Sequence, residues 1–148
     1  MSGQAPTAID RLVEQCRAGS CPRVVARMDS GWLVMAEQQE FDGYCLLLPD
    51  PVARHLNALT GARRTGFLAD MARAGDALLA ATQALRINYA MFGNAEPALH
   101  AHLFPRYATE PDTVRLLQPW ALDWRCAAVW LAATHGALQR RIAAALAP

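Results

Sequence analysis

One short apolar run constrains this chain more than any other stretch: residues 98–104, Ala-Leu-His-Ala-His-Leu-Phe. Its two histidines, His100 and His102, are separated by a single alanine. Successive side chains of a β-strand point to opposite faces, so a strand here places both imidazoles on one face of a sheet. Gly93 in front of the run indicates a turn, and Pro105 behind it is expected to end the strand. The sequence therefore predicts two imidazoles held side by side on a rigid strand.

Two interpretations of this pair involve no catalysis. In one, both histidines are ordinary residues of a solvated sheet face. In the other they share a metal ion, but a zinc site needs three or four protein ligands. The run itself contains no Asp, Glu or Cys, and His55 is a distant candidate for a further ligand. We expect no metal at this position.

Alternating hydrophobicity and turn residues predict an α+β architecture, an antiparallel sheet with helices packed on one face. The expected strands are residues 23–28, 32–36, 44–48, 86–92 and 99–104. The expected helices are residues 7–18, 65–85 and 135–146, with one or two helical turns over 52–59. Thr134 is the predicted N-cap of the last helix. The tail also carries Trp120, Trp124 and Trp130, which we interpret as packing residues.

Composition narrows the class of protein. The chain has 148 residues, of which 53% are hydrophobic and 18% are charged, so one globular domain over residues 1–148 is expected. A net charge of +1 argues against a nucleic-acid binder held by a basic surface. We expect no membrane span and no secretory signal, and therefore a cytoplasmic protein.

The four cysteines fit the same compartment. Cys16 and Cys21 have a C-x4-C spacing, which is wide for zinc, and no local His or Cys completes four ligands. We therefore predict no structural zinc and four free thiols in a reducing cytoplasm.

The stretch N-Y-A-M-F-G-N-A-E-P-A-L-H-A-H-L-F-P-R, residues 88–106, resembles the signature of the histidine triad (HIT) family of nucleotide hydrolases and transferases. That signature is His-x-His-x-His and two apolar residues, often followed by Pro-Arg. Counted back from Pro105, His102 falls on the third histidine and His100 on the middle one, while Ala98 stands in place of the first. The resemblance extends upstream through F-D-G-Y-C-L-L-L-P-D-P-V-A-R-H-L-N-A-L and covers about residues 23–106.

The resemblance implies a HIT-like fold and a mechanism. His100 would attack the α-phosphate of a nucleotide and form a covalent nucleotidyl-histidine, with His102 assisting. Phosphate binding is implied for Asn88, for Gly93 and for Asn94, whose amide would stabilise charge on the phosphoryl oxygens. The implied substrate is a nucleoside phosphate, dinucleoside polyphosphate or nucleotide conjugate, and no cofactor is needed. The family often forms dimers, so a homodimer is expected.

This chain departs from the family pattern at three positions. Ala98 removes the first histidine, and Ala95 replaces a polar residue that often assists the leaving group. Tyr44 stands where many members carry another supporting histidine, and we interpret Tyr44 and Arg106 as supporting residues. Three hypotheses follow. The protein is an active enzyme of this type, a nucleotide-binding protein with little catalysis, or an interaction protein whose two histidines are surface residues without a role in binding or catalysis.

Overall fold

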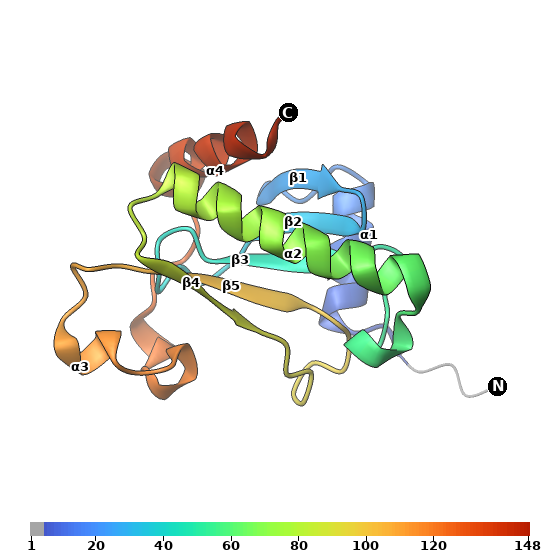
Figure 1. The fold of residues 1–148 in the computed structure, drawn as a ribbon, viewed down its shortest axis with the longest axis horizontal. Coiled ribbons are helices and arrows are strands. Elements are labelled where there is room, and N and C mark those ends of the chain that lie inside the picture. Colours follow the sequence, from blue (N-terminus) through green and yellow to red (C-terminus); the bar gives the residue numbers. More distant parts are fainter. Residues whose placement is uncertain (1–4) are drawn as a thin grey trace.

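The computed structural model describes residues 5–148, which form a five-stranded antiparallel sheet with helices on both sides (Figure 1). The strands lie in the order β1-β2-β3-β5-β4, and their bounds are β1 Val24–Met28, β2 Gly31–Met35, β3 Cys45–Pro49, β4 Arg86–Ala90 and β5 Ala101–Arg106. The α-helices are α1 Ala8–Arg17, α2 Gly61–Ala81, α3 Asp112–Arg115 and α4 Ala132–Leu146. Short 3-10 helices span Leu56–Ala58, Pro119–Ala121 and Trp124–Cys126. None of the helices in the described part of the chain has the length and hydrophobicity that a membrane span requires.

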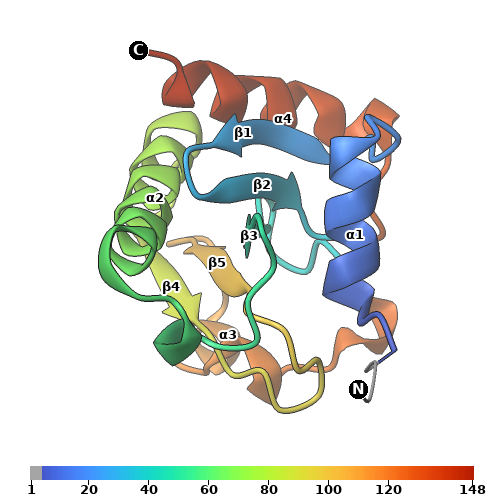
Figure 2. The same ribbon diagram turned by 90° about the vertical axis from the view of Figure 1, so that its right-hand side faces the viewer.

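The main core lies between one face of the sheet and the helices α2 and α4. Phe67 and Leu78 of α2 and Ile142 of α4 are fully buried against Leu33 and Leu47 of the central strands. Figure 2 shows α2 and α4 wrapping this side of the strands. The predicted α+β class with an antiparallel sheet is confirmed.

Helix α1 packs against the opposite face of the sheet. Its Ile9 and Val13 lie against Val34, Leu48 and Ala98. In Figure 2 it stands across the strands from α2. Helix α1 covers the part of this face formed by β2, β3 and the segment before β5, and the rest of the face is left for the tail and for the two histidines.

The fifth strand differs from its prediction at both ends. It begins at Ala101 and runs through Pro105 to Arg106, so Pro105 does not end it. Pro105 pairs with Ile87 of β4, whereas pairing with β3 stops at Leu103. Beyond Leu103 the strand has no β3 neighbour, so the missing N–H of proline costs no ladder hydrogen bond on that side.

The predicted N-cap of the last helix is wrong. Helix α4 begins at Ala132, and Leu131 is its N-cap, so Thr134 lies inside the first turn. The Leu131 N–H donates to Nδ1 of His135 at 3.0 Å. The buried imidazole of His135 thus reaches back to the backbone N–H of the N-cap residue, as the second side chain of a capping box does.

The other helices shift modestly from their predicted bounds. The long helix begins at Gly61 and ends at Ala81, four residues earlier at each end than expected. The helical turns expected over residues 52–59 reduce to the 3-10 turn Leu56–Ala58.

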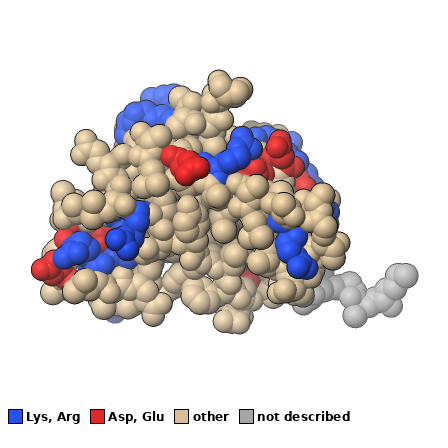
Figure 3. Space-filling view, in the orientation of Figure 1, with Lys and Arg blue, Asp and Glu red and all other residues tan. Residues whose placement is uncertain are grey.

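On the face over α2, the charged side chains of the described residues are scattered and form no continuous basic surface (Figure 3).

Candidate functional site

The two histidines lie at the amino-terminal end of β5. His102 is the second residue of the strand and pairs with Leu46 of β3 and Ala90 of β4, while His100 immediately precedes the strand. Their ring centroids are 4.6 Å apart. The prediction that the two imidazoles share a face is confirmed.

The residues between and beside them point the other way. Leu99, Ala101 and Leu103 are buried in the core under α2, whereas Ala98 lies in the α1 cluster. The strand period of two therefore extends back to Ala98 although regular pairing begins only at Ala101.

His100 is held by the backbone just before it. Its Nδ1 lies 2.7 Å from the carbonyl oxygen of Ala98, and the side chain is only 8% exposed. A carbonyl oxygen can only accept, so Nδ1 carries the proton and Nε2 carries the lone pair. The fold thus presents the tautomer of His100 that a nucleophilic Nε2 requires, and the interpretation of His100 as a bland solvated residue does not fit its burial.

His102 is held by a side chain instead. The hydroxyl of Tyr44 lies 2.6 Å from Nδ1 of His102. Burial raises the pKa of Tyr44, so the phenol keeps its proton. Burial, with a smaller contribution from His100, lowers the pKa of His102 to about 4 and keeps it neutral at pH 7. Since the imidazole nitrogen is the stronger base, the phenol donates to Nδ1, and the proton of His102 lies on Nε2.

The two rings therefore have complementary roles available to them. His100 offers a lone pair on Nε2, and His102 offers a proton on Nε2. Such a pair suits attack by one imidazole and assistance to a leaving group by the other.

His100 lines a cavity of about 280 Å³ beside the sheet. Three of its other lining residues, Arg54, His55 and Asn57, are polar. The remaining lining residues are Leu56, Met91, Phe92, Gly93, Ala98 and Leu99. His55, distant in sequence, is thus brought to the same cavity as His100. Within residues 5–148, however, no group of three or more His, Cys, Asp or Glu side chains is arranged to hold a metal ion.

The loop residues of the predicted site take different places. Gly93 lines the cavity and has a positive φ of 71°, a conformation that favours glycine. Asn94 is exposed and stands outside the set of described residues that line the cavity. The structure therefore brings Gly93 to His100 but does not bring the Asn94 side chain there.

Asn88 and Arg106 lie on the same sheet face but contact each other. Nη1 of Arg106 donates to Oδ1 of Asn88 at 2.9 Å and to the carbonyl of Leu117 at 2.8 Å. Arg106 is 6% exposed and also pairs with Glu110 at 2.8 Å. Arg106 thus fastens the tail to the sheet, and it reaches the histidines only through that tail.

The tail supplies a residue that sequence analysis placed only in packing. Trp120, in the turn Pro119–Ala121, has its ring centroid 4.8 Å from that of His102 and 5.1 Å from that of Phe104. It is also 4.9 Å from Phe92. The cluster of tryptophans in the tail was the one signal available, and it does not say which of them reaches the histidines. Trp124, by contrast, packs on Tyr44 and Phe104 as expected.

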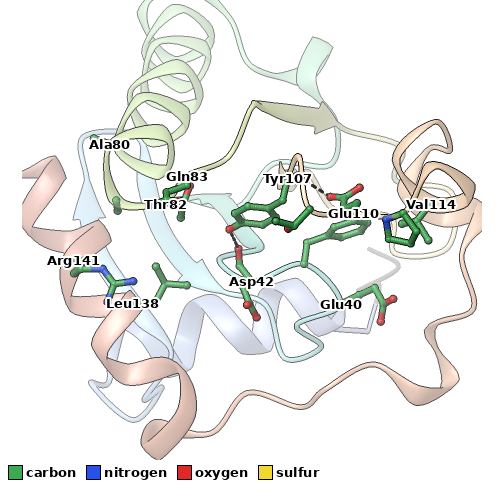
Figure 4. Close-up of a pocket in the computed structure, with 14 residues that line it drawn as sticks. Glu40, Asp42, Ala80, Thr82, Gln83, Tyr107, Glu110, Val114, Leu138 and Arg141 are labelled. Carbon is green, nitrogen blue, oxygen red and sulfur yellow. Dashed lines mark hydrogen bonds between the residues drawn. The ribbon is translucent and has the colours of Figure 1, made fainter.

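A larger cavity, of about 900 Å³, is drawn in Figure 4, and neither His100 nor His102 is among the described residues that line it. Its wall includes Asp42, Tyr107, Glu110 and Arg141, and the Tyr107 hydroxyl donates to the carbonyl of Asp42. It combines no nucleophile with a base, so the smaller cavity at His100 is the stronger candidate site.

No protein-family model matches the sequence, and no curated protein matches it. A Hit-like protein from Bartonella henselae, described as involved in cell-cycle regulation, superposes with a TM-score of 0.74 at 18% identity, covering 98% of this chain and 99% of that one. A histidine triad protein from Sinorhizobium meliloti 1021 gives 0.74 at 18% identity, with 95% and 97% covered. A hypothetical histidine triad nucleotide-binding protein from Sulfolobus tokodaii strain 7 gives 0.72 at 12% identity, with 92% and 91% covered. The fold is HIT-like, as the signature predicted.

Proposed function

We propose that this chain with a HIT-like fold is a nucleotide hydrolase or nucleotidyl transferase in which Nε2 of His100 attacks the α-phosphate. The substrate is a nucleoside phosphate, a dinucleoside polyphosphate or a nucleotide conjugate. The observation that carries the proposal is the 2.7 Å contact from Nδ1 of His100 to the Ala98 carbonyl, which leaves the Nε2 lone pair available.

In the first step a bond forms between Nε2 of His100 and the α-phosphorus. The bond from phosphorus to the leaving group breaks, and the leaving group takes its electron pair. The Nε2–H of His102 donates a hydrogen bond that stabilises the negative charge on the leaving group, which takes its proton from solvent. The Ala98 carbonyl stays bonded to the Nδ1–H of the now cationic His100 ring. The product is a nucleotidyl-histidine.

In the second step water, or another acceptor with a hydroxyl group, attacks the same phosphorus. The phosphorus–nitrogen bond breaks, and the proton that the attacking oxygen loses passes to solvent. The electron pair returns to Nε2 of His100, so both imidazoles end as they began. No metal is required in either step, although a polyphosphate substrate would carry magnesium.

Polar groups around the cavity support phosphate binding in this scheme. Asn57 lines it with His100 and carries an amide, and Arg54, whose guanidinium pairs with Asp10 at 3.2 Å, also lines it. We assign Gly93 to the backbone that faces the phosphate, and Asn88 to positioning, because its side chain is engaged by Arg106.

A second candidate is a nucleotide-binding protein with little catalysis. The observation in its favour is that Asn94 lies outside the cavity wall while Ala95 carries no polar group. Fewer donors then face the developing charge, and removal of one such donor costs about 10²–10³-fold in rate in a known hydrolase.

A panel of nucleotides separates the two candidates. Turnover of any member, with a nucleotidyl-protein intermediate, supports the enzyme. Thermal stabilisation of the protein by nucleotides without turnover supports the binding protein, since a ligand at 100 times its Kd adds about 2.7 kcal/mol to stability. We also propose a cytoplasmic homodimer, which sedimentation at several protein concentrations checks.

A further inference from the structure

Two large aromatic rings stand exposed beside the histidines. Phe92 is 60% exposed and Trp120 is 43% exposed, although their ring centroids are only 4.9 Å apart and their planes are nearly perpendicular. Single exposed apolar residues are ordinary on protein surfaces, but two adjoining rings, one of which lines a cavity, need an explanation.

Each ring is tied to one of the two histidines. Phe92 lines the same cavity as His100. Trp120 meets the ring of His102 edge to face, with centroids 4.8 Å apart. Through Phe92 the aromatic pair adjoins the cavity of the proposed nucleophile, and through Trp120 it adjoins the histidine proposed to assist the leaving group.

The tail holds Trp120 in this position before any ligand arrives. The indole N–H of Trp124 donates to the carbonyl of Pro119 at 2.8 Å. Arg106 fastens the preceding turn through the carbonyls of Val114 and Leu117, at 2.9 and 2.8 Å. A ring fixed in this way loses little conformational freedom when a second ring stacks on it.

We propose that Phe92 and Trp120 form a stacking subsite for a flat aromatic ring covalently joined to the phosphate that His100 attacks. This inference rests on the proposed function. The ring belongs either to the nucleobase or to the leaving group. Its chemistry is the same in both cases, and stacking on aromatic side chains is sequence-tolerant because every base has a π-face.

The test compares probes with and without a ring. Binding of AMP and of ribose 5-phosphate is measured for the wild type, Phe92→Ala, Trp120→Ala and Trp120→Phe. Turnover is measured for two esters of AMP, one with a naphthyl leaving group and one with a butyl leaving group. Leu116→Ala is the matched control, because Leu116 is an exposed apolar residue of the same tail, 77% exposed.

If the ring is the nucleobase, Trp120→Ala and Phe92→Ala weaken AMP binding on the order of 10- to 100-fold and leave ribose 5-phosphate unchanged. If the ring is in the leaving group, AMP binding is unchanged, and the preference for the naphthyl ester over the butyl ester falls by a similar factor. Trp120→Phe keeps an aromatic ring, so it should retain most of the wild-type AMP affinity or ester preference. A role in packing alone would affect both members of each pair equally.

Equal losses for ringed and ringless probes, or no loss at all, overturn the subsite. The binding arm requires no turnover, so it can fail while His100 still forms an adduct. Conversely, absence of any adduct in the wild type contradicts the proposed function. The subsite is then judged by the binding measurements alone.

Discussion

Nδ1 of His100 lies 2.7 Å from the carbonyl oxygen of Ala98, the residue that stands where the HIT signature has its first histidine. The backbone at this position, and not its side chain, sets the tautomer of the proposed nucleophile. Replacement of the first histidine by alanine therefore leaves the orientation of His100 in place.

The hydrogen bond between Tyr44 and His102 gives a first prediction. Tyr44→Phe leaves Nδ1 of His102 without its partner, which we expect to cost about 1–3 kcal/mol in the free energy of unfolding. Turnover should fall, but by less than the about 10²–10⁴-fold expected when the whole imidazole is removed. Denaturant unfolding and steady-state rates measure the two effects.

Tyr107→Phe is the matched control for this variant, since it removes the hydroxyl that donates to the Asp42 carbonyl in the larger cavity. It should lose stability without losing turnover. Equal turnover for Tyr44→Phe and the wild type would show that the Tyr44 hydroxyl does not serve the site.

The low pKa of His102 predicts a pH dependence of stability. Its pKa is about 4 in the folded protein and near 6.5 in the unfolded chain. As the pH falls through 6.5 the unfolded state takes up a proton that the folded state does not. The contribution of neutral His102 is therefore complete above pH 6.5 and is lost progressively toward pH 4.

Unfolding free energies measured between pH 7.5 and 5 check this sign. The wild type should lose stability more steeply with falling pH than His102→Gln, which lacks the titrating ring. Parallel curves for the two proteins would mean that His102 titrates normally in the fold.

The anchoring of the tail predicts a contrast between two arginines. Arg106→Leu leaves the carboxylate of Glu110 buried and unpaired, which we expect to cost about 3–5 kcal/mol. It should also expose the segment 107–131 to protease under native conditions. Arg125→Leu breaks an exposed pair with Asp123 and should change neither property. Similar proteolysis of both variants would place the anchor elsewhere.

Two glycines of α2 predict opposite effects of one substitution. A Cβ at Gly75 would lie 1.9 Å from the hydroxyl oxygen of Tyr89, whereas a Cβ at Gly66 meets no described atom within 4 Å. Gly66→Ala should add about 0.5–1 kcal/mol of stability through helix propensity. Gly75→Ala should cost about 1–3 kcal/mol unless Tyr89 is first replaced by alanine. Thermal unfolding decides, and stabilisation by both substitutions would show that Tyr89 moves aside freely.

Part of the site could be predicted from the sequence because it depends on local rules. The strand period of two places His100 and His102 on one face whatever the rest of the chain does. The expectation that Tyr44 supports the site came from the resemblance to the HIT family, many members of which carry a histidine there, and the structure brings its hydroxyl to His102. The order of strands and helices followed from hydrophobic periodicity in the same way.

The rest depends on tertiary contacts that no local pattern encodes. Trp120 reaches His102 because Arg106 holds the tail against the sheet. Trp120 and His102 are distant in the sequence and meet only in the folded protein. The start of α4 was missed because its N-cap, Leu131, makes no side-chain capping hydrogen bond, and its N–H is bonded instead to the imidazole of His135. Pro105 can continue β5 because pairing with β3 stops at Leu103, so that only β4 lies beside Pro105.

The central claim is that His100 is the nucleophile, and trapping the adduct tests it most directly. The protein is mixed with a labelled nucleotide substrate and denatured at alkaline pH, at which a phosphorus–nitrogen bond survives, and the mass and position of the adduct are measured. The account predicts one nucleotidyl group on His100 in the wild type, none in His100→Ala, and reduced but detectable adduct in His102→Ala. A nucleotidyl adduct in His100→Ala, or full turnover by that variant, would contradict the assignment and the mechanism built on it.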